Sequence, residues 1–169
     1  ALDVNVISGL ELSDYDSIDQ ACATIKTNSY DLVILNAGVL SNETLTAFDK
    51  EAYNAVEYQF KVNALAPLML ASRLKNQVVS GSKFILITSL MGSISDNSSG
   101  SRYGYRMSKS ALNAAAKSMA VDLAQQQISV GVFHPGYVQT GMTGFNGNIV
   151  PEQSAELLLA RIADLNTET

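Results

Sequence analysis

Tyr105 and Lys109 lie four positions apart near the start of an alanine-rich segment that extends to about Gln127. If this segment is a helix, the two side chains project from the same face, because four residues make roughly one helical turn. An ammonium group beside a phenol favours the phenolate and lowers the phenol pKa from its ordinary value near ~10. The pair therefore predicts a tyrosine that gives a proton to a developing alkoxide or takes one from an alcohol. A surface helix can carry the same spacing by chance, so the interpretation depends on the rest of the chain.

Ser89 is a second candidate, because it follows an apolar run at residues 84–88 that predicts a buried strand. Ligands of parallel sheets bind outside the carboxyl ends of the strands, and Ser89 would stand at such an end, near the start of the Tyr105 helix. A hydroxyl there can donate a hydrogen bond to a carbonyl oxygen. A serine that only caps a turn is the alternative.

Small residues follow the apolar run at 30–35, where the chain continues Asn36-Ala37-Gly38. Alanine and glycine let the backbone approach a flat ligand closely, and the asparagine can brace the neighbouring strand. Both a cofactor contact and a simple strand-exit turn agree with this tripeptide.

The apolar run at 128–133 is followed by His134 and a turn at Pro135-Gly136. This turn carries the chain over the rim of the predicted sheet, where Thr140 and nearby backbone groups could hold an amide or phosphate. His134, the chain's one histidine, is interpreted as a strand-end residue rather than a base.

The loop at residues 142–150 is expected to cover the substrate. Gly141, Gly144 and Gly147 would give this loop freedom to move. Its charge pattern indicates no particular class of compound.

Pro67 interrupts the helical pattern at residues 49–76. Proline has no N–H, so the carbonyl four residues earlier, that of Asn63, loses its helical partner. A freed carbonyl in a buried, kinked helix needs a water molecule. Asn63 is therefore a candidate anchor for a water chain toward a proton-transferring lysine; a packing kink with an incidental asparagine is the alternative.

These candidates are positioned by a chain in which extended and helical patterns alternate. The alternation predicts an α/β fold, a Rossmann-like doubly wound parallel sheet with helices on both faces (three-layer αβα), in a single domain over residues 1–169. The almost wholly apolar run at 30–35 favours a strand covered on both faces. The predicted strands are residues 4–12, 30–35, 84–88 and 128–133, and the predicted helices are residues 14–26, 49–76, 103–127 and a last helix from Pro151.

Composition narrows the function classes. The chain has 169 residues, of which 47% are hydrophobic and 16% charged, a globular composition with enough material for one core. The net charge of -5 and the lack of a Lys/Arg cluster argue against binding to nucleic acid or an anionic membrane. The single Cys22 excludes a disulfide framework and a cysteine-based metal site, and no apolar run reaches the ~20 residues of a membrane span. We therefore expect a cytoplasmic protein with no metal, nucleic-acid or membrane site.

With these residues assembled, the chain resembles the short-chain dehydrogenase/reductase family over nearly its whole length. The matching motifs stand in the family's order, at family-like spacings and on the expected elements. The segments at 91–94, 96–100 and 103–106 resemble the C-factor-type branch in particular. The matching residues are Asn36-Ala37-Gly38, Asn63, Ser89, Tyr105, Lys109, Pro135-Gly136 and Thr140.

The resemblance implies hydride transfer between NAD or NADP and the carbon of a small-molecule carbonyl or alcohol. It implies Tyr105 as the catalytic acid/base, Ser89 as the group that polarises the carbonyl, and Lys109 as the residue that lowers the tyrosine pKa and holds the nicotinamide ribose. Asn63 would support the proton relay. Residues 10–12 resemble the end of the family's third strand, where an acidic residue often meets the adenine. The implied cofactor-binding residues are Glu11, Leu12, Asn36, Ala37, Gly38, Tyr105, Lys109, Pro135, Gly136, Val138 and Thr140.

The sequence departs from the family at both ends, so the fold is expected to be incomplete there. Family members begin with a βαβ unit whose Gly-rich turn brings a helix N-terminus to the pyrophosphate, and this chain carries no such turn. The strand that normally follows the last helix is absent as well. We expect the sequence to be part of a longer protein; the alternative is a fragment with little cofactor affinity.

Two function classes stay open. The complete set of Ser89, Tyr105 and Lys109 favours an oxidoreductase. The missing Gly-rich turn favours a non-catalytic regulatory or signalling protein that binds a dinucleotide or a partner on the same fold.

The helices around 50–76 and 103–127 are candidates for subunit contact, so we expect a homodimer or homotetramer. Small side chains on the second helix would allow close approach of a neighbouring helix, although they could equally pack on the sheet. These residues are Ala111, Ala114, Ala115, Ala116 and Ala120.

Overall fold

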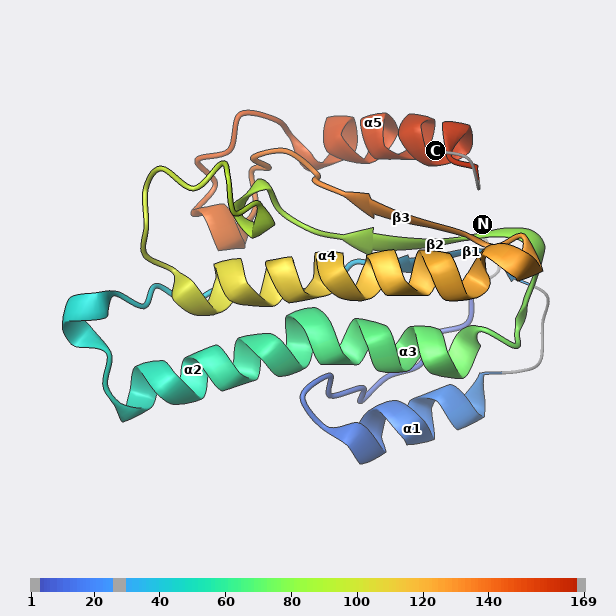
Figure 1. Cartoon of the computed structure of the whole chain (residues 1–169), viewed down its shortest axis with the longest axis horizontal. Helices are drawn as coiled ribbons and strands as arrows, with labels where there is room; N and C mark the ends of the chain where they lie inside the picture. The colour runs from blue at the N-terminus through green and yellow to red at the C-terminus, as the bar shows by residue number, and fades with distance from the viewer. Residues whose placement is uncertain (1–3, 26–29, 167–169) are drawn as a thin grey trace.

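The computed structural model describes residues 4–25 and 30–166. Its three strands are parallel and form one sheet in the order β1 (Tyr30–Leu35), β2 (Val78–Ile87), β3 (Ser129–Phe133). Helices lie on both faces of this sheet, so the predicted three-layer αβα fold is confirmed (Figure 1). The helices are α1 (Tyr15–Thr24), α2 (Lys50–Phe60), α3 (Ala66–Leu74), α4 (Tyr103–Leu123) and α5 (Pro151–Asp164).

The central strand β2 supplies side chains to both halves of the core. Successive side chains of a strand point to opposite faces. Phe84 and Leu86 therefore pack with α3 and α4 on one face, whereas Ile85 and Ile87 pack with Ile162 of α5 on the other. The two helical layers are thus held together through one buried strand.

Local signals in the sequence explain where the helices begin. Asp14 and Asp49 are N-caps whose carboxylates accept hydrogen bonds from the backbone N–H groups of Ser17 and Ala52, each at 2.9 Å. Pro151 is the first residue of α5, where its missing N–H costs no helical hydrogen bond. The predicted starts of these helices are confirmed to within about one residue, the ordinary uncertainty of helix ends.

The long helix predicted at residues 49–76 is interrupted, as expected from Pro67. Between α2 and α3 lies a π-helical turn (Lys61–Leu65), in which the N–H of Ala66 donates to the carbonyl of Lys61, five residues earlier. This widened turn carries Asn63, whose side chain is fully buried. Such π turns occur frequently at functional sites.

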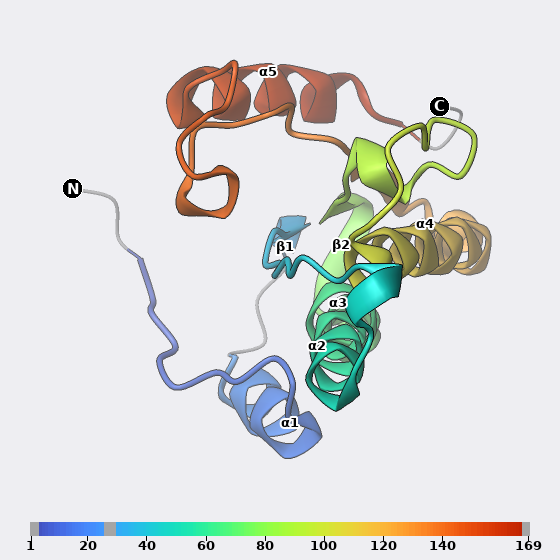
Figure 2. The ribbon, with the colours of Figure 1, turned by 90° about the vertical axis from the view of Figure 1, so that its left-hand side faces the viewer.

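The strand predicted at residues 4–12 is wrong, because residues 4–10 have no regular secondary structure. A strand needs a neighbour for its N–H and C=O groups, and this segment pairs with none of the described strands. Figure 2 shows it running apart from β1. A cavity of about 620 Å³ is lined by Val6 and Ile7 of this segment and by Leu32 of β1.

The prediction that the run at 30–35 is covered on both faces is also wrong. Leu32 is 37% exposed and Ile34 is 44% exposed, while only Leu35 is buried. β1 is an edge strand of the sheet, and in the described residues no helix covers the side chains of Leu32 and Ile34. The strand is therefore less buried than its apolar sequence predicted.

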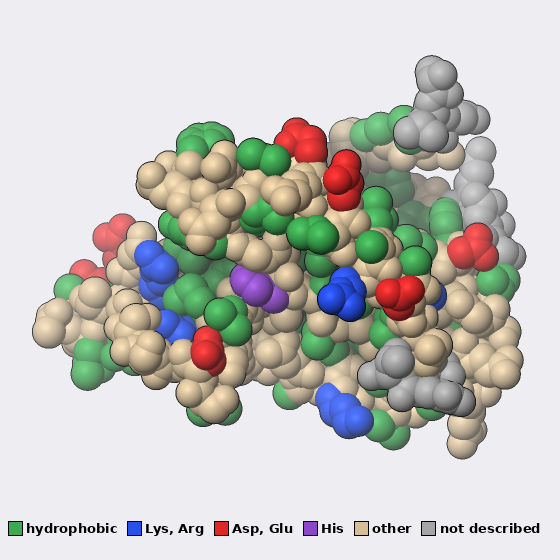
Figure 3. Space-filling model, turned by 90° about the horizontal axis from the view of Figure 1, so that it is seen from above, with side chains coloured by type: hydrophobic (Ala, Val, Ile, Leu, Met, Phe, Trp, Pro, Cys, Tyr) green, Lys and Arg blue, Asp and Glu red, His purple; other side chains and the backbone are tan. Residues whose placement is uncertain are grey.

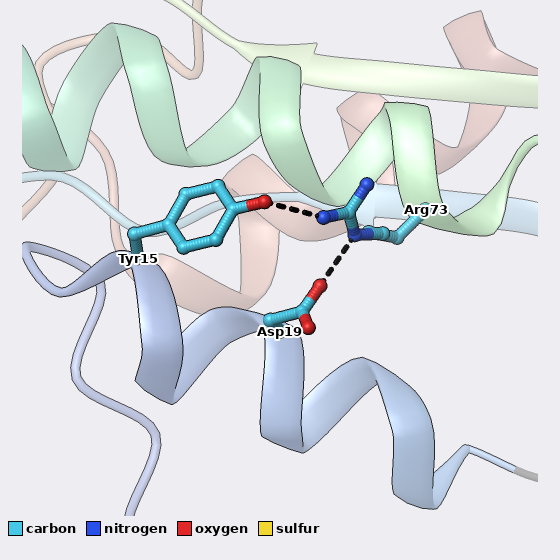
Figure 4. A network of polar contacts seen from close by, with 3 residues as sticks. All are labelled: Tyr15, Asp19 and Arg73. Carbon is cyan, nitrogen blue, oxygen red and sulfur yellow. Dashed lines mark hydrogen bonds and ion pairs between the residues drawn. The ribbon is translucent and has the colours of Figure 1, made fainter.

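The helix α1 packs on α3 rather than on the sheet. Ile18 and Cys22 are buried between the two helices. On the surface, Arg73 of α3 donates from Nε to Asp19 at 2.7 Å and from Nη2 to the hydroxyl of Tyr15 at 2.7 Å (Figure 4). Exposed pairs of this kind orient α1 and contribute little stability.

Hydrophobic side chains are exposed on the α5 side of the molecule. Leu157 and Leu159 are more than half exposed. Figure 3 shows hydrophobic side chains scattered over this face, with acidic and basic side chains among them. Within residues 4–25 and 30–166, no helix combines the length and the apolar character that crossing a membrane requires.

Candidate functional site

The carboxyl ends of the three strands border one cavity of about 1070 Å³. Ligand and cofactor sites commonly enclose about 300–1,000 Å³, so this cavity has room for a cofactor together with a small substrate. Asn63, Glu11 and Leu12 are not among its lining residues. The predicted residues that line it are Asn36, Ala37, Gly38, Ser89, Tyr105, Lys109, Pro135, Gly136, Val138 and Thr140.

Ser89 and Tyr105 meet in this cavity although sixteen residues separate them. Ser89 has extended backbone before a short 3-10 turn, and its hydroxyl accepts a hydrogen bond from the N–H of Met91 at 3.2 Å. The Tyr105 side chain is buried at the start of α4, and Ser89 is its hydrogen-bond partner. Ser89 thus caps a turn and also presents a hydroxyl to the phenol.

Burial raises the pKa of Tyr105 above its ordinary value, and the hydrogen bond with Ser89 opposes this shift. This direction is opposite to the one expected from the spacing of Tyr105 and Lys109. The ammonium nitrogen of Lys109 lies 5.8 Å from the centroid of the Tyr105 ring, so desolvation of the phenol outweighs it. The phenol is consequently held in its neutral form.

Lys109 lines the cavity, and its side chain is held by a hydrogen bond to the last residue of β2. Its Nζ donates to the carbonyl of Ile87 at 2.8 Å, and the residue is 3% exposed. Burial lowers the pKa of Lys109 to about 8, because the ammonium is poorly hydrated there. The lysine therefore remains mostly protonated at neutral pH but loses its charge within a mildly alkaline range.

Asn63 joins the exit of β1 to α4. Its Oδ1 accepts from the N–H of Val39 at 2.8 Å, and its Nδ2 donates to the Val39 carbonyl at 2.8 Å and to the hydroxyl of Ser108 at 3.0 Å. All side-chain polar atoms of this buried amide are thus paired. The asparagine fixes the segment that carries Gly38 beside the helix that carries Lys109.

The space at Gly38 is consistent with the close approach of a ligand. A Cβ atom added there would lie 3.4 Å from both Asn63 Oδ1 and Lys109 Nζ, so a side chain would occupy the space in front of these two groups. The glycine leaves that space free. The residues present therefore fit a flat, polar cofactor fragment.

A buried acid that the sequence analysis missed fixes the start of α4. Glu43 accepts hydrogen bonds from the hydroxyl of Ser41, from the amide of Gln59 and from the N–H of Gly104, the last at 3.3 Å. The one available signal was the spacing of Gln59 and Asn63, two polar residues four positions apart on a helix whose inner face is otherwise apolar. The partners come from three separate segments, so the network itself could not be predicted.

The turn after β3 is fixed in position by a hydrogen bond from α5. Gly136 has φ of 88°, in the left-handed region that favours glycine. The hydroxyl of Ser154 in α5 donates to the carbonyl of Pro135 at 2.6 Å. His134 also lines the cavity, and burial lowers its pKa.

Gly147 does not provide the loop mobility that was predicted for it. A Cβ atom at Gly147 would lie 2.3 Å from the backbone carbon of Val138, so this glycine permits two backbone segments to touch. A bridge between Val138 and Ile149 and the hydrogen bond from Gln139 N–H to the Ile149 carbonyl at 2.9 Å join the same segments. The two ends of this loop are therefore joined by backbone contacts, which restrict its motion.

The structure does not bring Glu11 and Leu12 to the cavity, which corrects their assignment to the cofactor site. The Glu11 carboxylate accepts from the N–H and hydroxyl of Ser13, and these hydrogen bonds lower its pKa. Leu12 packs against the cluster that contains Ile18. Both residues follow a segment that does not join the sheet, so they do not stand at its rim.

Several known proteins are similar to this chain. A 1-hydroxy-2-glutathionyl-2-methyl-3-butene dehydrogenase of Rhodococcus sp. is 32% identical over 175 residues, covering 100% of this chain and 76% of the relative. The protein named C-signal of Myxococcus xanthus is 36% identical over 144 residues, covering 84% of this chain and 86% of the relative. The crystal structure of an NADPH-bound carbonyl reductase from chicken fatty liver matches with a TM-score of 0.85 at 27% identity, covering 96% of this chain and 71% of that chain.

The family is shown by the sequence itself. Residues 5–148, which are most of the chain, match the sequence profile described as short chain dehydrogenase. The two relatives above and the parallel αβα fold agree with this match, and the C-signal relative agrees with the predicted C-factor-like branch. The chain belongs to the short chain dehydrogenase family.

Proposed function

We propose that this chain carries the active site of an oxidoreductase that uses NAD or NADP to interconvert a carbonyl compound and an alcohol. The observation that carries the proposal is the meeting of the Ser89 hydroxyl, the Tyr105 phenol and the Lys109 ammonium group at one cavity. The relatives named as dehydrogenase and carbonyl reductase, the latter bound to NADPH, support it.

In the direction of reduction, Ser89 donates a hydrogen bond to the carbonyl oxygen of the substrate, while Tyr105 transfers its phenolic proton to the same oxygen. A bound reduced nicotinamide supplies the hydride that the carbonyl carbon accepts. The C=O double bond becomes a C–O single bond as one C–H bond and one O–H bond form, and Lys109 would stabilise the phenolate that remains. The raised pKa of Tyr105 keeps the phenol protonated at neutral pH, which is the form that proton donation requires.

Two segments at the rim, together with Lys109 of α4, would hold the cofactor. Asn36 and Gly38 after β1, and Val138 and Thr140 after β3, line the cavity from opposite sides. Lys109 lines the same cavity and would hold the hydroxyl groups of the nicotinamide ribose. The Asn63 carbonyl, in the widened turn behind Gly38, would anchor the proton relay that restores the Tyr105 proton.

The test is nicotinamide absorbance during incubation of the protein with NADH or NADPH and a panel of aldehydes and ketones. We expect turnover that falls at least about a hundredfold in Tyr105→Phe, which removes the proton donor and keeps the ring. Tyr103→Phe is the matched control, because Tyr103 begins the same helix but does not line the cavity. Equal rates in wild type and Tyr105→Phe would refute the role of Tyr105.

A second candidate function is a regulatory or signalling protein that binds a dinucleotide without turnover. The similarity to C-signal, whose name states a signal rather than a reaction, favours it. Nicotinamide binding measured by calorimetry, with no change in absorbance over the whole panel, would support this candidate instead.

A further inference from the structure

The cavity carries positive charge although the chain as a whole is acidic. The sequence contains 16 acidic and 11 basic residues, yet none of the residues that line the cavity is Asp or Glu. Arg102 and Lys109 are the lining residues with basic side chains of high ordinary pKa. An anionic group that enters this cavity therefore meets no acidic lining residue that would repel it.

The two cations differ in what they already contact. Lys109 is buried, and its Nζ donates to the Ile87 carbonyl. The Arg102 side chain is exposed to the cavity; its Nε donates to Asn42 Oδ1 at 3.0 Å, and its Nη1 lies 4.0 Å from the sulfur of Met91. In the described part of the chain, no carboxylate forms an ion pair with Arg102.

The backbone holds Arg102 in an unusual conformation. Its φ and ψ are 53° and 47°, in the left-handed region that non-glycine residues seldom adopt, and Ser101 before it also has a φ of 53°. The Arg102 N–H donates to the carbonyl of Glu43 at 2.9 Å, and its own carbonyl begins the hydrogen bonding of α4 by accepting from Arg106 at 3.0 Å. Persistent strain of this kind clusters at ligand-binding positions.

We propose that Arg102, oriented by Asn42, binds a carboxylate on the substrate while Ser89 and Tyr105 act on its carbonyl. The guanidinium group has a planar set of donors that matches the two oxygens of a carboxylate, and its Nη2 has no partner among the described residues that the structure records. Arg102 lies one turn before Tyr105 at the start of α4, so the anion and the carbonyl would belong to one small molecule. This inference rests on the proposed oxidoreductase function and names its substrate class, the oxo-carboxylates.

The first experiment compares methyl-ketone carboxylates that have two to five methylene groups between ketone and carboxylate, each paired with its methyl ester. We expect the wild-type protein to reduce at least one acid with a kcat/KM about ten- to a hundredfold above that of its ester. Arg102→Gln should abolish this preference, mainly by raising KM for the acid, so that acid and ester are reduced with similar kcat/KM. Arg102→Lys should restore part of the preference, because it restores the charge without the planar donor pair.

Arg161→Gln is the matched control, because it removes the same charge from α5 at a position that does not line the cavity. It should retain the preference for the acid. If Arg102→Gln turns over acid and ester in the same ratio as wild type, the carboxylate site is refuted and the proposed reaction still stands.

A binding measurement separates the two proposals if no ketone is reduced. The Nε–H signal of Arg102 is followed by NMR during titration with 4-oxopentanoate and, separately, with its methyl ester. A shift with the acid alone supports the carboxylate site even where the proposed reaction fails. Identical spectra with both compounds refute the site.

Discussion

The ammonium nitrogen of Lys109 lies 5.8 Å from the centre of the Tyr105 ring, and both side chains are buried. Their pKa values move in opposite directions: burial raises that of the phenol and lowers that of the ammonium group to about 8. The lysine, rather than the tyrosine, is therefore the group of the pair that titrates near neutral pH.

The first prediction concerns the pH dependence of carbonyl reduction. The neutral phenol needed for proton donation persists through neutral pH, because its pKa is raised. The ammonium form of Lys109 is present below its pKa of about 8 and is lost as the pH rises through that value. We expect kcat/KM to be level below about pH 7 and to decline through about pH 8. Steady-state rates between pH 6 and 10 check this, and a decline that begins only above pH 10 would contradict it.

The second prediction concerns the amide of Asn63. Asn63→Leu leaves the N–H and carbonyl of Val39 without their partners in a partly buried place, so we expect a loss of about 2–5 kcal/mol in the free energy of unfolding. Urea denaturation measures it. Asn54→Leu, at an exposed position of α2, is the control and should change stability by no more than about 0.5 kcal/mol.

The third prediction concerns Glu43, which joins three segments at the start of α4. Glu43→Gln replaces one acceptor oxygen by an amide and puts a donor against the hydroxyl of Ser41 and the amide of Gln59, or against the N–H of Gly104. We expect a loss of about 1–3 kcal/mol, measured by thermal unfolding. Glu57→Gln breaks only an exposed ion pair with Lys61 and should cost less than about 1 kcal/mol. Equal effects of the two substitutions would show that the buried network is unimportant.

The fourth prediction contrasts two glycines of the loop beside the cavity. Gly147→Ala forces a methyl group into the backbone of Val138, and we expect a loss of about 1–3 kcal/mol with a raised KM for the cofactor. An added Cβ at Gly141 meets nothing within 4 Å, so Gly141→Ala should be neutral or slightly stabilising. Unfolding curves and cofactor titrations of both variants give the comparison.

The fifth prediction concerns self-association through α2, α3 and α4. Met107, Ala114 and Val121 are exposed at intervals of seven residues on α4, while Ala116 packs into the core and cannot serve this contact. We expect a dimer or tetramer in light scattering at micromolar concentration, and dissociation in Val121→Glu. Leu157→Glu on α5 should leave the assembly intact. A wild-type monomer at that concentration would contradict the prediction.

Much of the fold followed from local signals. The run at 30–35 forms β1 with the predicted bounds, Asp49 caps α2, and Pro151 begins α5. The convergence of Ser89 with Tyr105 was also predictable, because the ends of parallel strands and the helix starts beside them share one rim.

What failed depended on contacts between distant segments. Residues 4–12 carry a strand-like pattern, but no described strand pairs with residues 4–10, so the assignment of Glu11 to the cofactor site failed with it. The position of Arg102 in the cavity requires the carbonyl of Glu43 and the side chain of Asn42, sixty residues away in sequence. The spacing of residues along the chain does not predict such a contact between distant segments.

The sequence by itself determined the parallel αβα fold and the identity of the groups at the rim of the sheet. The spacing of apolar residues, the residues that cap helices and the residues that follow each strand are all read from neighbouring positions in the chain. Only the tertiary structure decided the protonation of Tyr105, the burial of Lys109 and the charge of the cavity. Those depend on which distant side chains exclude water from the site and which are left facing it.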